Sequence, residues 1–317
     1  MSGGPAPFHR DVAGGPAEVR ALWIEAVDGA RLRAALWPAG GRGTVAMFPG
    51  RTEFCEKYAD AAAHLAARGF ASAAIDWRGQ GLTARAGRHR MLGHVEDFSE
   101  FQRDVDAFVT LLDTQGMPRP FHLLAHSMGG AIGLRALLRR LPFANAVFSA
   151  PMWGLPLVPH QRLAAWALAN AGGLLGLSGS AVPRSGKVAD PASAPFERNL
   201  LTTDRAMFVW MKRQIAVHPE LALGGPTVGW LRSALGEMRA LAALPSPATP
   251  CLALLGTEEA IVDPAAVRDR MDRWPGGRLE MVANARHEVL MEGDTRRARL
   301  FDEVAARFAA ETDTPHT

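Results

Sequence analysis

Three residue types that cooperate in nucleophilic catalysis follow three short apolar runs, in the order serine, acid, histidine. Ser127 follows "FHLLA" (121–125), Glu259 and Asp263 follow "CLALLG" (251–256), and His287 follows "RLEMV" (278–282). A serine hydroxyl is a weak nucleophile until a base removes its proton, and a carboxylate can hold a histidine base in the required tautomer. The order and spacing therefore predict a catalytic triad with a serine nucleophile.

The neighbours of Ser127 are small, as a sharp turn requires. In "AHSMGG" (125–130), Ala125 and Gly129 lie two positions on either side of the serine, and Gly130 follows. The G-x-S-x-G pattern of a strand-to-helix elbow lacks its first glycine here, and a buried turn serine would need equally small neighbours. The later acid and histidine favour the catalytic reading.

The elements that must position these residues alternate along the chain. Apolar runs predict strands at 21–27, 30–37, 44–48, 70–76, 121–125, 145–150, 251–256 and 278–282. Amphipathic spacing predicts helices at 54–68, 95–114, 128–140, 264–273 and 295–311. This alternation predicts an α/β fold, a mostly parallel sheet with helices on both faces, opened by an antiparallel hairpin at Asp28-Gly29.

The alternation stops for about 90 residues after Pro151, which predicts an insertion. We expect a tail at 1–20, a core of 21–150 and 241–312, a mainly helical cap at 151–240, and a second tail at 313–317. The apolar stretch 163–182 contains Asn170 and several glycines, so it is a poor membrane-spanning helix. We interpret it as part of a lid or of the core.

Composition narrows the class of protein. Apolar residues make up 48% of the 317 residues, charged residues 21%, and the net charge is +3, all typical of a globular protein. Basic runs interleaved with aromatics do not occur, which argues against nucleic-acid binding. The two cysteines, Cys55 and Cys251, and the N-terminus, which does not resemble a secretory signal, favour the cytoplasm. We expect no metal and no cofactor, because the chain has no H-E-x-x-H or Cys/His cluster and "RGQG" (78–81) is not a dinucleotide motif.

Five segments resemble the successive motifs of the lysophospholipase and monoacylglycerol lipase branch of α/β-hydrolases. They are "FPGRTEFCEKY", "DWRGQG", "AHSMGG", "GTEEAIVD" and "ARHEVLMEGD". In addition, "NLLTTDRAMF" and "ELALGGPTVGWL" resemble cap segments of bacterial lysophospholipases. The resemblance spans about residues 20 to 310. It implies the α/β-hydrolase fold and a serine hydrolase that cleaves carboxylic esters of lysophospholipid or monoacylglycerol through an acyl-enzyme.

The resemblance also assigns roles to individual residues. Ser127 matches the nucleophile and His287 the base. Glu259 stands where the family has the aspartate of G-x-x-D-x-x-V, and Asp263, four residues later, is the alternative acid. The family's oxyanion hole implies the backbone N–H groups of Met128 and Arg51, although Pro49 replaces the family's histidine in that loop.

For four further residues, a purely structural role is an alternative to a functional one. Glu53 and Tyr58 match family positions near the oxyanion loop, where a structural role competes with substrate contact. His126 is expected to be structural, because neighbouring side chains point apart, and His122 is expected to pack on its strand.

The sequence is also compatible with other activities. An esterase, thioesterase or lactonase for a small substrate, and a non-catalytic binding protein, are the alternatives. The expected partner is a small ester or lipid, with transient membrane-surface contact through the cap. The sequence does not indicate an oligomeric state.

Overall fold

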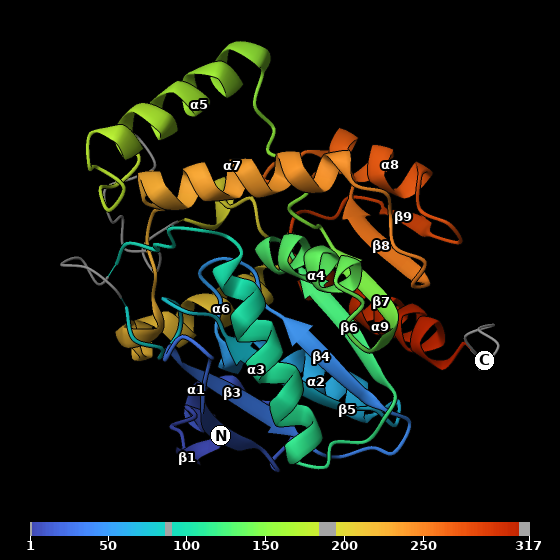
Figure 1. Ribbon diagram of the computed structural model, residues 1–317. Helices are drawn as coiled ribbons and strands as arrows, with labels where there is room; N and C mark the ends of the chain where they lie inside the picture. Colours follow the sequence, from blue (N-terminus) through green and yellow to red (C-terminus); the bar gives the residue numbers. More distant parts are fainter. Residues whose placement is uncertain (1, 86–90, 184–194, 311–317) are drawn as a thin grey trace.

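A single sheet runs through the computed structural model, which describes residues 2–85, 91–183 and 195–310 (Figure 1). Its strand order is β1-β2-β3-β5-β4-β6-β7-β8-β9. The strands are β1 (Ser2–Pro5), β2 (Arg20–Glu25), β3 (Arg31–Trp37), β4 (Thr44–Phe48), β5 (Ala71–Asp76), β6 (Phe121–His126), β7 (Phe143–Ser149), β8 (Cys251–Gly256) and β9 (Arg278–Val282).

The sheet is parallel from β5 to β9 and antiparallel at its other end. β1 to β3 pair with their neighbours antiparallel, and β3 also pairs antiparallel with β5. β5, β4, β6, β7, β8 and β9 pair in parallel. All residues of β4, β5, β6 and β8 are buried, which explains why these strands appear in the sequence as continuous apolar runs.

Helices cover both faces of the sheet, as expected from the sequence. α2 (Ala59–Ala66) and α9 (Asp294–Ala309) contact each other, α2 packing against β5 and α9 against β7 and β8. α3 (Glu100–Thr114) and α4 (Met128–Leu138) pack together, and α4 also contacts β4, β6 and β7. α8 (Pro264–Asp272) contacts β9. A mostly parallel sheet between two layers of helices is the α/β architecture that the sequence predicts.

The chain between β7 and β8, which we call the insertion (residues 150–250), carries three more α-helices in its described parts, 150–183 and 195–250. They are α5 (Pro159–Leu174), α6 (Arg205–Val217) and α7 (Val228–Ala243), with short 3₁₀ turns η3 (Phe196–Arg198) and η4 (Pro219–Leu221). α7 contacts both α4 and α5, and Figure 1 shows α5 at the far edge of the molecule from the sheet. Within the described residues, every helix is too short or too polar to cross a bilayer.

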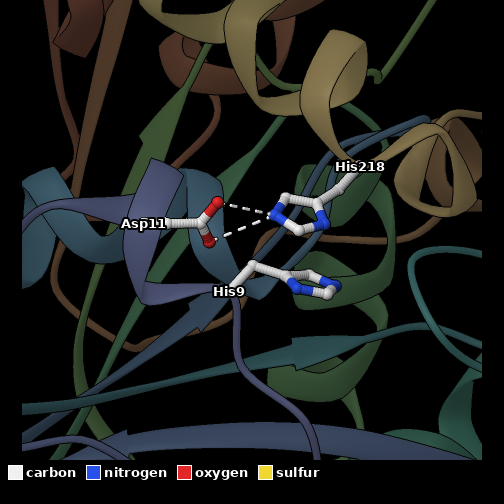
Figure 2. A group of neighbouring side chains, drawn as sticks. All are labelled: His9, Asp11 and His218. Carbon is white, nitrogen blue, oxygen red and sulfur yellow. Dashed lines mark hydrogen bonds and ion pairs between the residues drawn. The ribbon is translucent and has the colours of Figure 1, made fainter.

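The segment 1–20 is more structured than the expected tail. β1 pairs with β2, and α1 (Arg10–Ala13) packs against α6. Figure 2 shows how side chains join the two: the His9 and His218 rings stack at 3.7 Å, and the Asp11 carboxylate accepts a hydrogen bond from His218 Nε2 at 2.9 Å. These contacts link distant parts of the chain, so local composition does not reveal them. The other expected tail, 313–317, lies outside the described residues.

Two helices begin later than expected. α2 starts at Ala59, after the 3₁₀ turn η1 (Cys55–Tyr58), rather than at residue 54. α3 starts at Glu100 rather than at residue 95, although Val95 and Phe98 are buried as their spacing predicted. The Asp97 side chain accepts the N–H of Ser99, and the Glu100 side chain accepts the N–H of Asp97. Such local side-chain bonds favour a turn over a helix, so the first apolar positions of the pattern belong to a loop.

Candidate active site

Ser127 occupies the sharp turn between β6 and α4. Its backbone has φ 51° and ψ −118°, a conformation that a non-glycine residue adopts only under constraint. Three backbone hydrogen bonds provide that constraint: the Ser127 N–H donates to Ser149 O, and its carbonyl accepts from the N–H groups of Gly130 and Met152. The strained turn presents the hydroxyl beyond the carboxyl end of the strand.

Gly129 and Gly130 are required because neighbouring atoms leave no room for a Cβ at either position. A Cβ on Gly129 would lie 2.1 Å from the carbonyl oxygen of Phe48, and one on Gly130 would lie 2.5 Å from the Cβ of Pro151. These distances are impossible for real atoms, so α4 can begin this close to β4 only with glycine there. Ala125, in place of the motif's first glycine, is fully buried on β6.

Ser127, His287 and Glu259 form one hydrogen-bonded line. The Ser127 hydroxyl donates to His287 Nε2 at 2.9 Å, and His287 Nδ1–H donates to Glu259 Oε2 at 2.8 Å. His287 lies in the loop after β9, and Glu259 lies in the loop after β8. Because these parallel strands end at the same edge of the sheet, three residues far apart in sequence meet there.

Glu259 is held in place by the turn that carries it. Its Oε1 accepts the backbone N–H groups of Ile261 at 2.5 Å and of Val262 at 3.0 Å. Burial alone would raise the pKa of this carboxyl, but the hydrogen bonds from His287 and from the two amides outweigh it and lower the pKa. The side chain is therefore ionised near neutral pH and can stabilise an imidazolium.

The alternative acid is used elsewhere. Asp263 accepts the N–H of Ala265 at 2.9 Å as the N-cap of α8, and its own N–H donates to the carbonyl of Gly154. Of the two acidic side chains, the structure brings Glu259 to His287 and leaves Asp263 at a helix end.

The two backbone groups expected to form an oxyanion hole belong to Arg51, in the loop after β4, and to Met128, directly after the serine, and both residues line the same cavity region as Ser127 or adjoin it. In the loop after β4, the N–H of Gly50 donates to the Glu53 carboxylate and that of Thr52 to Gln80 Oε1 at 2.6 Å. The Arg51 N–H between them has no acceptor among the described residues. Met128 is the first residue of α4, where N–H groups have no intrahelical partner. Both amides are thus available to a developing negative charge.

A buried cluster of charged side chains lies beside this line. The Lys57 ammonium binds the carboxylates of Glu53 and of Glu288, the latter at 2.5 Å, and the Tyr58 hydroxyl donates to Glu53 at 2.6 Å. His126 lies 3.4 Å from Glu288 through Nε2. Burial opposes charge on His126, but Glu288 and Glu53 outweigh it and raise the pKa of the imidazole. The two carboxylates therefore face the Lys57 ammonium and an imidazole whose protonated form they favour, so groups of opposite charge adjoin in the interior.

Most contacts within this cluster could not be predicted from the sequence. His126 does point away from the Ser127 hydroxyl, donating through Nδ1 to Ser149 O at 3.0 Å, yet its ring centroid lies 4.8 Å from that of His287. Glu53 and Lys57 are four residues apart, a spacing that could have suggested a pair. Glu288 directly follows the histidine, but its contact with a residue 231 positions earlier has no local signal. His122 packs as expected, stacked on Phe308.

The triad opens into a cavity of about 510 Å³ that is lined largely by apolar side chains of the insertion. Ser127, His287 and the loop Gly50–Glu53 form one side of it. The apolar side consists of Met152, Leu155, Leu201, Phe208, Met211, Ile215, Ala222, Leu223 and Trp230. An apolar cavity with a few convergent polar groups is typical of a site for a largely apolar ligand.

The chain matches a protein-family model and is similar to curated proteins over most of its length. The family model described as "Serine aminopeptidase, S33" matches residues 40–294. Lysophospholipase L2 of Escherichia coli is 34% identical over 269 residues, covering 80% of this chain and 76% of the relative. Probable lysophospholipase L2 of Haemophilus influenzae is 30% identical over 258 residues, covering 80% of each chain.

Solved structures share the fold at lower identity. A soluble variant of monoglyceride lipase from Saccharomyces cerevisiae has a TM-score of 0.71 and 20% identity, covering 96% of this chain and 98% of the other. A thermostable carboxyl esterase from Bacillus coagulans has a TM-score of 0.73 and 14% identity, covering 92% and 98%. The fold, the family match and the two curated relatives agree, so the chain belongs to the serine aminopeptidase S33 family of α/β-hydrolases, in the branch that contains lysophospholipase L2.

Proposed function

We propose that the chain is a serine hydrolase that cleaves carboxylic esters of lipid-like substrates, lysophospholipid or monoacylglycerol. The observation that carries this proposal is the line from Ser127 through His287 to Glu259, open to an apolar cavity of about 510 Å³. The curated relatives named lysophospholipase L2 support the lipid class of substrate.

The reaction proceeds through an acyl-enzyme. Ser127 Oγ attacks the ester carbonyl carbon while His287 Nε2 takes the hydroxyl proton, and the backbone N–H groups of Arg51 and Met128 stabilise the oxyanion. His287 then returns the proton to the leaving alcohol as the C–O bond breaks. In the second half, the same imidazole deprotonates a water molecule, which attacks the acyl carbonyl carbon. The bond to Ser127 Oγ then breaks, the imidazolium returns the proton to that oxygen, and the fatty acid leaves. Glu259 stabilises the imidazolium in both halves.

A panel of nitrophenyl esters of increasing acyl length tests the substrate class. The apolar lining predicts that kcat/KM rises from acetate to decanoate, because each buried methylene adds about 0.8 kcal/mol of favourable transfer. Ser127→Ala is expected to abolish all of these activities. A preference for acetate would instead favour an esterase for small substrates, and unchanged activity of Ser127→Ala would refute the serine mechanism.

We propose further that the insertion acts as a cap that contacts a membrane surface from the cytoplasm. Leu175 and Leu177, just after α5, are 73% and 48% exposed at the edge of the molecule. The two cysteines are free and buried, which suits a reducing compartment. Co-sedimentation with anionic phosphatidylglycerol vesicles should fall when both leucines become serine, and should persist for Val217→Ser, a matched exposed site on α6. Equal binding by all three proteins would contradict this role.

A further inference from the structure

The active-site cavity is lined by three cations in different electrostatic situations. Lys57 binds two carboxylates and is neutralised inside the buried cluster. Lys212 lies on α6, with its Nζ 5.4 Å from the centre of the Phe208 ring. Arg51 extends from the oxyanion loop toward the insertion and forms no ion pair with a carboxylate among the described residues. The position of the Arg51 charge beside the oxyanion loop therefore needs an explanation.

The Arg51 guanidinium is positioned but not neutralised. Its Nη2 donates to the carbonyl of Gly224 at 2.6 Å, and its Cζ lies 5.2 Å from the centre of the Trp230 ring. The Nε atom is buried without an acceptor in the described part of the chain. Burial lowers the pKa of Arg51 to about 10, so the group is still charged at neutral pH. A buried, charged donor without an acceptor is unfavourable unless a ligand supplies the acceptor.

We infer that the Arg51 side chain binds the phosphate of a substrate head group, which makes lysophospholipid rather than monoacylglycerol the preferred ester. This inference rests on the proposed function. Guanidinium N–H groups match phosphate oxygens in geometry and charge. In a lysophospholipid only the glycerol backbone separates the acyl ester from the phosphate. One residue can therefore serve both, its backbone N–H at the oxyanion and its side chain at the phosphate. A neutral monoacylglycerol would leave the guanidinium without an anion.

The test compares two soluble substrates with the same short acyl chain, a lysophosphatidylcholine and a monoacylglycerol, both below their micelle concentrations. Arg51→Met keeps the backbone N–H and removes the charge. We expect kcat/KM for the phospholipid to fall about 10- to 100-fold further than kcat/KM for the neutral ester, the range for lost charged hydrogen bonds. Arg51→Lys should recover part of the loss. Arg213→Met, an exposed cation on α6, should change neither substrate.

A second measurement avoids lipid substrates altogether. Glycerophosphocholine should inhibit hydrolysis of nitrophenyl butyrate competitively in the wild type, and its inhibition constant should rise about 10-fold or more in Arg51→Met. Glycerol should not inhibit either protein at the same concentrations.

Two results would overturn the inference without touching the proposed function. An equal loss on both esters would mean that Arg51 only fastens the oxyanion loop to the carbonyl of Gly224. An unchanged preference for phospholipid would mean that the phosphate binds elsewhere. Absence of activity on both esters in the wild type would instead refute the proposed function, and this inference with it.

Discussion

Replacing Glu259 by glutamine tests how the His287 base is oriented. The side-chain oxygen of glutamine would keep the N–H groups of Ile261 and Val262, which now bind Oε1 at 2.5 and 3.0 Å. The amide NH₂ would then face His287 Nδ1, which now donates to Oε2 at 2.8 Å. Two donors cannot share a hydrogen bond, so the proton would move to Nε2. In that tautomer the imidazole cannot accept the proton of Ser127.

The expected loss is large. The corresponding exchange of an aspartate for asparagine in another serine hydrolase triad lowers kcat by about 10⁴-fold, or about 5 kcal/mol at 1.36 kcal/mol per factor of ten. The assay is steady-state release of nitrophenol from a decanoate ester, with KM expected to stay within about 3-fold. Asp263→Asn is the matched control, because asparagine can also cap α8, and it should retain activity within about 2-fold. Near-normal turnover of Glu259→Gln together with an inactive Asp263→Asn would reverse the assignment.

Four further substitutions test packing around the site and at the N-terminal segment. In urea titrations, Gly129→Ala should lower the free energy of unfolding by about 1–3 kcal/mol or more, because its Cβ would meet the Phe48 carbonyl. Gly236→Ala is the control: its Cβ lies in open space on α7, so the free energy of unfolding should rise by about 0.5–1 kcal/mol. Equal effects of the two substitutions would contradict the packing described for Gly129. Glu288→Gln should cost about 3–5 kcal/mol at pH 7 by removing one carboxylate from a buried charged cluster, and a cost below about 1 kcal/mol would show that the cluster is solvated. His218→Ala should lower the Tm more at pH 5.5 than at pH 8.5. The reason is that Asp11 raises the pKa of His218, so the stabilisation from this ion pair is lost as the pH rises through that pKa. A Tm difference that does not depend on pH would show that the loss of stability does not come from this ion pair.

The parts of this protein that follow from sequence are those with a local cause. The strands β4, β8 and β9 begin and end where their apolar runs do, because each is bounded by turn residues. The positions of Ser127 and His287 after parallel strands bring them to one edge of the sheet, so their proximity follows from chain order. The choice of Glu259 over Asp263 rests on the turn through Ile261 and Val262, a geometry that residue types alone do not determine.

The parts that sequence missed depend on contacts between distant residues. β1 pairs with β2 through backbone hydrogen bonds, to which a Gly- and Pro-rich composition gives no signal. The pairing of Lys57 with Glu288, like the contact of His218 with Asp11, exists only once the fold has joined the segments. The Arg51 side chain is similar: its burial is created by Gly224 and Trp230 of the insertion.

We expect Ser127 to carry the acyl group as an ester during turnover. The measurement is mass spectrometry of the protein after brief reaction with nitrophenyl decanoate, whose good leaving group makes deacylation the slow step, followed by an acid quench and proteolysis. We predict a decanoyl adduct on the peptide containing Ser127, competed away by prior treatment with a fluorophosphonate and absent in Ser127→Ala. Turnover of the ester with no adduct at residue 127, or with an adduct on another residue, would contradict the account.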